Sequence, residues 1–250
     1  ALAAVAPAVH TLCGPHTQVL PAMNGVPWWF FEGLPGPCEG LSLNSVDPGG
    51  RLRALIPAAQ VVGCVVHASS TVPAPGAVRH VNGNGLVIGR PAGGADAGLQ
   101  TLAALLSRAG FAVTVSDRIQ RDVWFKLWGN MTMNPVSALT GAPCDRILDD
   151  PLVRGFISAV MREAQALGAA FGIPIDQAPE ERHAVTRKLG SFKTSMLQDT
   201  LAGRPLEIDA LVGAVREIGQ HLGQDTPHID ALLGLVRLMA RERGLYPWPA

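Results

Sequence analysis

The stretch from Asp122 to Pro135 constrains the fold most, because it is helical in character and apolar on nearly every side. A helix of this kind is usually buried. Three polar residues interrupt it at intervals of four, namely Lys126, Asn130 and Asn134. At about 100° per residue, side chains with this spacing lie within about 80° of one another on one helix face. A buried row of one ammonium and two amides is unfavourable unless polar groups face it.

Two kinds of partner could face this row. Side chains of neighbouring helices would make it a structural stripe of hydrogen bonds between packed helices. Alternatively, a small oxo- or hydroxy-acid would be oriented by the amides, while Lys126 supplies charge and a proton. The spacing alone leaves both interpretations open.

Composition excludes several classes of protein. Hydrophobic residues make up 48% of the 250 residues and charged residues 16%, which is enough for a sizeable core and argues against disorder. Lys+Arg and Asp+Glu are both 20, so the charge gives no case for binding nucleic acid or an anionic membrane. No apolar run is long enough to span a membrane. The four scattered cysteines favour reduced thiols in the cytoplasm over a disulfide framework or a metal site.

The order of patterns predicts two parts, an α/β part over residues 1–116 and an all-α part over residues 117–250. We expect the first part to be an incomplete Rossmann-like sheet to which antiparallel strands are added. Helices are expected at 1–12 and 95–110, and strands at 18–20, 61–67, 78–81, 85–89 and 111–115, with a hairpin turn at Asn82–Asn84. Beyond residue 116 no convincing strand pattern follows.

Asn24 follows the first expected strand in an Asn-Gly turn. Ligands of open α/β sheets bind at the carboxyl ends of strands, so Asn24 is well placed for a cofactor, although Asn-Gly is also a common simple turn. The glycines between Gly83 and Gly89 do not have the G-x-G-x-x-G spacing and enter a strand instead of opening a helix. No stretch of this sequence has the strand, glycine fingerprint and helix of a dinucleotide-binding start.

Two further polar groups remain once the apolar core is assigned. Thr194 and Ser195 precede a short predicted helix, and Glu207 opens a strongly amphipathic one. Each has a simple structural interpretation. Ser195 would cap its helix, and the helix dipole would favour a carboxylate at position 207 by about 0.3–1 kcal/mol.

Taken together, these motifs resemble the ketopantoate reductase (2-dehydropantoate 2-reductase) family. The resemblance extends from about residue 1 to 245, with an insertion near 27–50. The matching motifs, in order, are Asn24-Gly25, His67-Ala-Ser69, Lys126-x-x-x-Asn130-x-x-x-Asn134-Pro135, Ser195-Met-Leu-Gln-Asp199 and Glu207-Ile-Asp209.

The resemblance implies NADPH-dependent reduction of 2-dehydropantoate to pantoate, a step of pantothenate biosynthesis. It makes Lys126 the general acid that protonates the ketone oxygen. Substrate-binding roles fall to Asn130, Asn134, Thr194 and Ser195, and NADP-binding roles to Asn24, Ser69 and Glu207. The implied partner is a small 2-oxo acid, and the apolar helices of the second part leave room for a homodimer.

Two departures from the family limit what the resemblance implies. Cys144 stands where the family often has an asparagine that binds substrate. The glycine fingerprint and the strands around it, roughly 75–80 residues, are not in this sequence, so we expect residues 1–250 alone to bind NADPH poorly. Reduction of another bulky 2-oxo acid, or a non-catalytic helical remnant or dimerisation module, are the alternatives.

Overall fold

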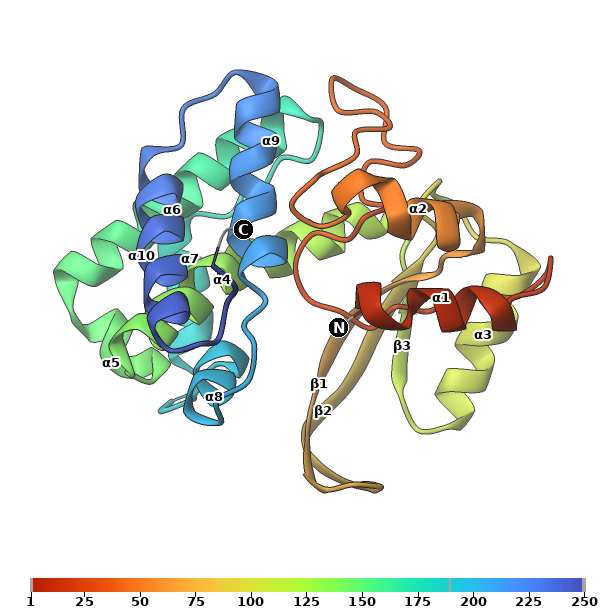
Figure 1. Ribbon diagram of the computed structural model, residues 1–250, viewed down its shortest axis with the longest axis horizontal. Coiled ribbons are helices and arrows are strands. Elements are labelled where there is room, and N and C mark those ends of the chain that lie inside the picture. The colour runs from red at the N-terminus through yellow and green to blue at the C-terminus, as the bar shows by residue number, and fades with distance from the viewer. Residues whose placement is uncertain (1, 189, 249–250) are drawn as a thin grey trace.

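The computed structural model describes residues 2–188 and 190–248, which form an α/β part and a helical part side by side (Figure 1). The α/β part contains α1 (Leu2–Leu12), α2 (Arg51–Leu55), β1 (Gly63–Ala74), β2 (Ala77–Gly89), α3 (Ala97–Arg108), β3 (Ala112–Val115) and two helical turns, η1 (Pro48–Gly50) and η2 (Ala58–Gln60). The helical part contains α4 (Ile119–Thr140), α5 (Cys144–Asp149), α6 (Pro151–Ala170), α7 (Pro179–Arg187), α8 (Ser195–Leu201), the π-helical turn η3 (Asp209–Gly213), α9 (Ala214–Leu222) and α10 (Pro227–Glu242). An α/β part followed by an all-α part is therefore confirmed.

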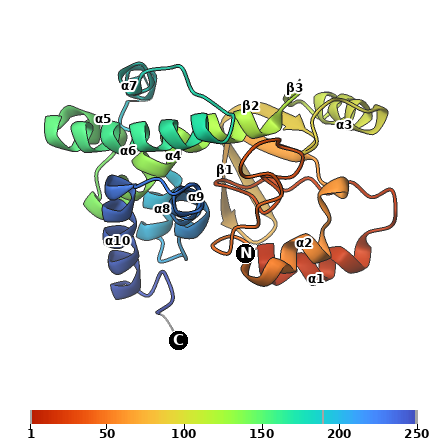
Figure 2. The ribbon, with the colours of Figure 1, turned by 90° about the horizontal axis from the view of Figure 1, so that it is seen from above.

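The sheet is mixed and has helices on both faces. β1 pairs antiparallel with β2, and β2 pairs parallel with β3. The segment before Asn24 joins the sheet only through isolated parallel bridges, from Val19 to Val61 and from Ala22 to Cys64. The strand expected at 18–20 is therefore an extended segment without a regular ladder. α1 and α2 lie on one side of the sheet and α3 on the other (Figure 2).

The hairpin turn was predicted at the wrong place. β2 runs without a break from Ala77 to Gly89, and the chain reverses at Pro75–Gly76, where Gly76 has φ +78°. The Asn82–Asn84 segment lies inside β2 opposite a register shift between His67 and Ser69. Its turn-forming residues produce a bulge, because a strand tolerates one extra residue as a local irregularity.

The helices of the second part begin at recognisable caps. Asp150 accepts hydrogen bonds from Leu152 N and Val153 N at the start of α6, and Pro151 occupies the first turn, where a missing N–H has no consequence. α4 continues through Pro135, although proline removes one backbone donor. Packing on all sides holds this stretch helical, since Met133, Pro135 and Val136 are all buried.

One hydrophobic core extends across both parts. The aromatic cluster from Trp28 to Phe31 is buried. Phe30 lies 6.0 Å from both Trp124 of α4 and Phe171 beyond α6, measured between ring centroids. A smaller cluster fills the space between the sheet and α3. The central helix α4 therefore packs against residues of both parts. Whether residues 1–116 and 117–250 behave as separate domains stays a prediction.

No helix in the part of the chain that the structure describes is long and apolar enough to cross a membrane.

Candidate active site

Lys126, the first member of the polar row of α4, contacts the turn after the extended segment and the strand β1. Lys126 Nζ donates one hydrogen bond to Asn24 Oδ1 at 2.9 Å and another to the Val66 carbonyl at 2.7 Å. An ammonium group has three N–H donors, so one remains for a ligand. The lysine therefore joins the helix to two segments of the α/β part, and its third donor has no partner among the described residues.

The surroundings of Lys126 favour release of its proton. Burial lowers the pKa of Lys126 below its ordinary value, because the charged form loses hydration. Negative charge on Cys64 and on Glu207 raises the pKa of Lys126. A lowered pKa brings an ammonium closer to the range in which it is an effective general acid.

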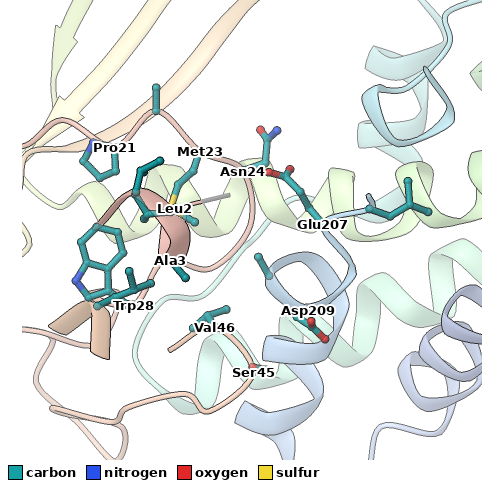
Figure 3. Close-up of a pocket in the computed structure, with 15 residues that line it drawn as sticks. Leu2, Ala3, Pro21, Met23, Asn24, Trp28, Ser45, Val46, Glu207 and Asp209 are labelled. Carbon is teal, nitrogen blue, oxygen red and sulfur yellow. The ribbon is translucent and has the colours of Figure 1, made fainter. Parts of the chain in front are cut away.

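Asn24 is held in place by a tight junction between the turn after Ala22 and the start of η3. Gly25 has φ +80°, and Val26 N donates to the Ala210 carbonyl at 2.8 Å. Glu207 stands just before this helical segment, and Figure 3 shows its carboxylate beside the Asn24 amide. Burial raises the pKa of Glu207, and its hydrogen bond with Asn24 lowers it. Glu207 is exposed to the open cavity, but the protein atoms around its carboxylate still make desolvation the larger effect.

A cavity of about 530 Å³ opens next to Asn24 and Glu207 (Figure 3). Its wall is mostly apolar, with the indole of Trp28 on one side, and its polar groups include Asn24, Glu207, Asp209 and Ser45. The Ser45 hydroxyl is buried and has no hydrogen-bond partner among the described residues. Such an unpaired hydroxyl is unfavourable unless a ligand or water completes it.

The other two members of the row have different partners. Asn130 lines a gap of about 10 Å³ together with Asn24 and Lys126, which is room for about one water molecule. Asn134, only 5% exposed, donates from Nδ2 to Ser195 Oγ at 3.4 Å. The row thus runs from Asn24 to Ser195 of α8.

Two predicted residues are placed less directly. Thr194 is buried, and its Oγ1 accepts a hydrogen bond from Leu197 N at 3.1 Å, so Thr194 caps α8 and the interpretation of Ser195 as the cap is wrong. Ser69 lies on β1 at the register shift, three positions beyond Val66, and no hydrogen bond joins its side chain to the other candidates in the described chain. The structure therefore brings Asn24, Lys126, Asn130 and Glu207 together, and separately Asn134 with Ser195.

The Val66 carbonyl is a lysine partner that sequence reasoning missed. Every residue carries a carbonyl, so no sequence signal marks the one that a buried lysine will contact. Among the residues described, no group of three His, Cys, Asp or Glu side chains is arranged to hold a metal ion.

Comparison with known proteins identifies relatives of this chain. The family model "Ketopantoate reductase PanE/ApbA C terminal" matches residues 118–240. A 2-dehydropantoate 2-reductase of Mesorhizobium japonicum is 45% identical over 235 residues, which cover 94% of this chain and 72% of that protein. The crystal structure of a putative ketopantoate reductase from Ralstonia solanacearum superposes with a TM-score of 0.94 at 60% identity, covering 98% of this chain and 75% of the other.

These matches, together with the two-part fold, place the chain in a class of oxidoreductases with a helical second part. Within that class, the chain belongs to the ketopantoate reductase family.

More distant solved structures share the fold. A D-mandelate dehydrogenase, solved with NADH and anilino(oxo)acetate, has a TM-score of 0.80 at 20% identity over 97% of this chain. A ketopantoate reductase from Staphylococcus aureus, described as dimeric, has a TM-score of 0.73 at 20% identity.

Proposed function

We propose that this chain reduces 2-dehydropantoate to pantoate with NADPH, with Lys126 as the proton donor. The observation that carries the proposal is the contact between Lys126 Nζ and Asn24 Oδ1 at 2.9 Å. It joins the polar row of the central helix to the edge of the sheet where a ligand of an α/β fold binds.

The residues around the large cavity fit the nicotinamide end of NADPH. Asn24 and Glu207 offer an amide and a carboxylate at its rim, and the unpaired Ser45 hydroxyl lies in its wall. A ribose presents hydroxyl groups that can donate to Glu207 and accept from Asn24. The proposal therefore assigns cofactor binding to Asn24 and Glu207. The assignment of Ser69 to the cofactor rests on the family motif alone.

Bound NADPH supplies a hydride to the ketone carbon. As negative charge develops on the ketone oxygen, Lys126 stabilises it with the N–H that neither Asn24 nor Val66 uses, and then transfers the proton. Asn130, Asn134 and Ser195 orient the hydroxyl and carboxylate of the acid. Thr194 acts through its cap, which sets the position of Ser195 at the first turn of α8.

A second candidate is reduction of another bulky 2-oxo acid, and Cys144 favours it. The Cys144 side chain is 2% exposed, and burial raises the pKa of its thiol to about 11, so it is neutral. Its backbone N–H donates to the Phe192 carbonyl at 3.0 Å, close to the segment that leads to Ser195. A buried neutral thiol is a weak hydrogen-bonding group, so this position lacks the hydrogen bonds with which an asparagine would favour 2-dehydropantoate.

Turnover measurements separate the two candidates. The full-length gene product that contains these 250 residues is assayed with NADPH against 2-dehydropantoate and against an aromatic 2-oxo acid such as phenylglyoxylate. A higher kcat/KM for 2-dehydropantoate supports the proposal, and a higher value for the aromatic acid supports the second candidate. Failure to oxidise NADPH with any 2-oxo acid contradicts both. A homodimer and a cytoplasmic location stay predictions from the sequence.

A further inference from the structure

After α10 the chain returns to the segment that carries Glu207. Gly244 has φ +68°, and Leu245 N donates to the Ala240 carbonyl at 2.7 Å, so the backbone reverses directly at the end of the helix. The Leu245 carbonyl then accepts a hydrogen bond from Leu206 N at 3.1 Å, and both leucine side chains are buried. The residue before Glu207 is therefore fixed to the C-terminal segment.

A second contact joins the same segment to Asp209, two positions after Glu207. Tyr246 Oη donates a hydrogen bond to Asp209 Oδ1 at 2.7 Å. A hydrogen bond to a carboxylate is stronger than one between neutral groups. Burial, followed by the bond to Asp209 and its charge, raises the pKa of Tyr246 to about 12, so the hydroxyl stays protonated and remains a donor. The C-terminal segment thus holds the chain on both sides of Glu207.

The segment held in this way borders the large cavity. Asp209 begins the π-helical turn η3, and it lines the cavity of about 530 Å³ together with Glu207 (Figure 3). Turns of this kind are rare and frequently occur at functional sites. Contacts from outside the turn hold its start, since Tyr246 binds Asp209 and Val26 N donates to the Ala210 carbonyl at 2.8 Å. The place of the Glu207 carboxylate at the cavity therefore depends on these contacts.

Arg241 of α10 fixes the ring of Tyr246. Its guanidinium carbon lies 5.5 Å from the centre of the Tyr246 ring and 5.4 Å from the centre of the Trp248 ring, as in cation–π contacts. Arg241 Nε also donates to the Pro247 carbonyl at 3.1 Å. These contacts hold the C-terminal segment on α10 and set the direction in which the tyrosine hydroxyl points.

We propose that Tyr246 is a positioning residue for the cofactor, which acts through Asp209 to hold the Glu207 carboxylate where it can bind the nicotinamide ribose of NADPH. This inference rests on the proposed function and adds the C-terminal segment to it. Tyr246 does not line the cavity, so it acts only through the residues that it contacts. A carboxylate that is already in place binds ribose hydroxyls more tightly, because less ordering is needed on binding.

The test separates the nicotinamide half of the cofactor from the rest. Dissociation constants are measured for NADPH and for adenosine 2′,5′-bisphosphate, which lacks the nicotinamide riboside. The full-length gene product is used as wild type, Tyr246→Phe and Trp248→Phe. Trp248→Phe is the matched control, because Trp248 stacks on the same guanidinium, is 59% exposed and makes no hydrogen bond to Asp209 in the described chain.

Tyr246→Phe should raise the dissociation constant for NADPH about three- to tenfold, the usual effect of losing one hydrogen bond. The dissociation constant for adenosine 2′,5′-bisphosphate should not change, because Glu207 does not bind this half of the cofactor. The value of kcat at saturating NADPH should stay near that of the wild type, so the effect appears in KM. Trp248→Phe should leave both dissociation constants unchanged.

A double variant tests whether Tyr246 acts through Glu207. In a Glu207→Ala background the carboxylate is absent, so adding Tyr246→Phe should weaken NADPH binding much less than it does in the wild type. The same fold-change in both backgrounds would show that Tyr246 acts independently of Glu207 and would overturn the inference.

An equal loss of affinity for NADPH and adenosine 2′,5′-bisphosphate in Tyr246→Phe would show a general loosening of the protein and also overturn the inference. Unchanged NADPH binding in Tyr246→Phe would overturn it as well and would leave the proposed function intact. A wild-type protein that does not bind NADPH would instead contradict the proposed function, and with it this role of Tyr246.

Discussion

Lys126 uses two of its three N–H groups on Asn24 and the Val66 carbonyl, and this fixes the direction of the third. The two fixed bonds also explain how a charged side chain is tolerated in a largely apolar helix, because a buried ammonium needs acceptors. Its pKa is then set by a balance between burial, which lowers it, and the charge of Glu207, which raises it.

This balance predicts the effect of Glu207→Gln on the pH profile. Turnover requires protonated Lys126, so kcat falls as the pH rises through the lysine pKa, which burial places below the ordinary value. Removing the Glu207 charge withdraws stabilisation from the ammonium and should move this fall to lower pH. The measurement is kcat against pH at saturating NADPH. An alkaline limb that stays in place or moves to higher pH would contradict this coupling.

At the level of residues, the row of Lys126, Asn130 and Asn134 could be predicted from spacing alone, because helical geometry is local. Asn24 and Glu207 could be predicted as site candidates only from the family motifs, because an Asn-Gly turn and a carboxylate at a helix end are both common structural features. The contact of the Arg182 side chain with Phe125 and Gly129 could not be predicted, because it depends on tertiary packing between distant segments.

At the level of elements, the junction between Gly25 and η3 determines how far Asn24 lies from Glu207. A side chain at Gly25 would begin 2.5 Å from the Ala210 carbonyl oxygen, and the residue has φ +80°. The Ala210 carbonyl also accepts the hydrogen bond from Val26 N. Only glycine fits both the conformation and the space.

Gly25→Ala should therefore destabilise the protein more than a glycine replacement that affects conformation alone. Gly94 is the matched control, with φ +74° and nothing within 4 Å of an added side chain. Gly94→Ala should lower the free energy of unfolding by about 1–2 kcal/mol. Gly25→Ala should lower it further and raise the KM for NADPH. Chemical denaturation measures the free energy of unfolding of both variants. Equal losses in the two variants would contradict a stabilising role for the close contact between Gly25 and Ala210.

The contact between α6 and α7 predicts a pH-dependent stability. Ser158 Oγ and His183 Nε2 lie 2.9 Å apart and are buried. Burial is the main cause that lowers the pKa of His183, so the folded protein favours the neutral ring. The unfolded chain binds a proton more readily, and stability is lost as the pH falls through the unfolded value of about 6.5.

Thermal unfolding between pH 8 and pH 5 measures this effect. The midpoint of the wild type should fall toward pH 5, and His183→Gln, which cannot take up the proton, should show a smaller fall. His67 shifts in the same direction and is present in both proteins, so the difference between them isolates His183. Parallel curves for the two proteins would rule out this role of His183.

The elements of the sheet were predicted only in part. Alternating and apolar runs located β3 and the first half of β1, because those patterns depend on which face is buried, but they divided the single strand β2 into two. The hairpin turn was misplaced because Asn82–Asn84 and Pro75–Gly76 are both typical turn sequences. The pairing of β1 with β2 places the turn at Pro75–Gly76.

At the level of the whole molecule, the two parts share a core. Phe30 from the α/β part is fully buried between Phe31, Trp124 and Phe171, all within 6.0 Å between ring centroids. A change in this cluster should therefore affect the stability of both parts. The change from mixed sheet to helices near that residue was visible in the sequence, but contacts across it depend on tertiary packing that no local pattern encodes.

Phe30→Ala should lower the free energy of unfolding by about 3–5 kcal/mol, the usual range for loss of a buried aromatic ring. Helical circular dichroism and tryptophan fluorescence should lose their signals together, in one transition. Leu152→Ala is the control, because Leu152 is 84% exposed and its removal should change stability by no more than about 0.5 kcal/mol. Two separated transitions in the wild type would contradict a shared core.

The most direct test of the account is the turnover of Lys126→Met. Methionine keeps much of the length and apolar contact of the side chain but has no ammonium. In the full-length gene product, kcat/KM for 2-dehydropantoate should fall about 10²- to 10⁴-fold, as expected for loss of a general acid. The protein should remain folded, with a thermal midpoint lowered by the loss of the hydrogen bonds to Asn24 and Val66, and the assay is run at NADPH concentrations that saturate the variant. Turnover near the wild-type rate in a correctly folded Lys126→Met protein would contradict the central claim that Lys126 protonates the substrate.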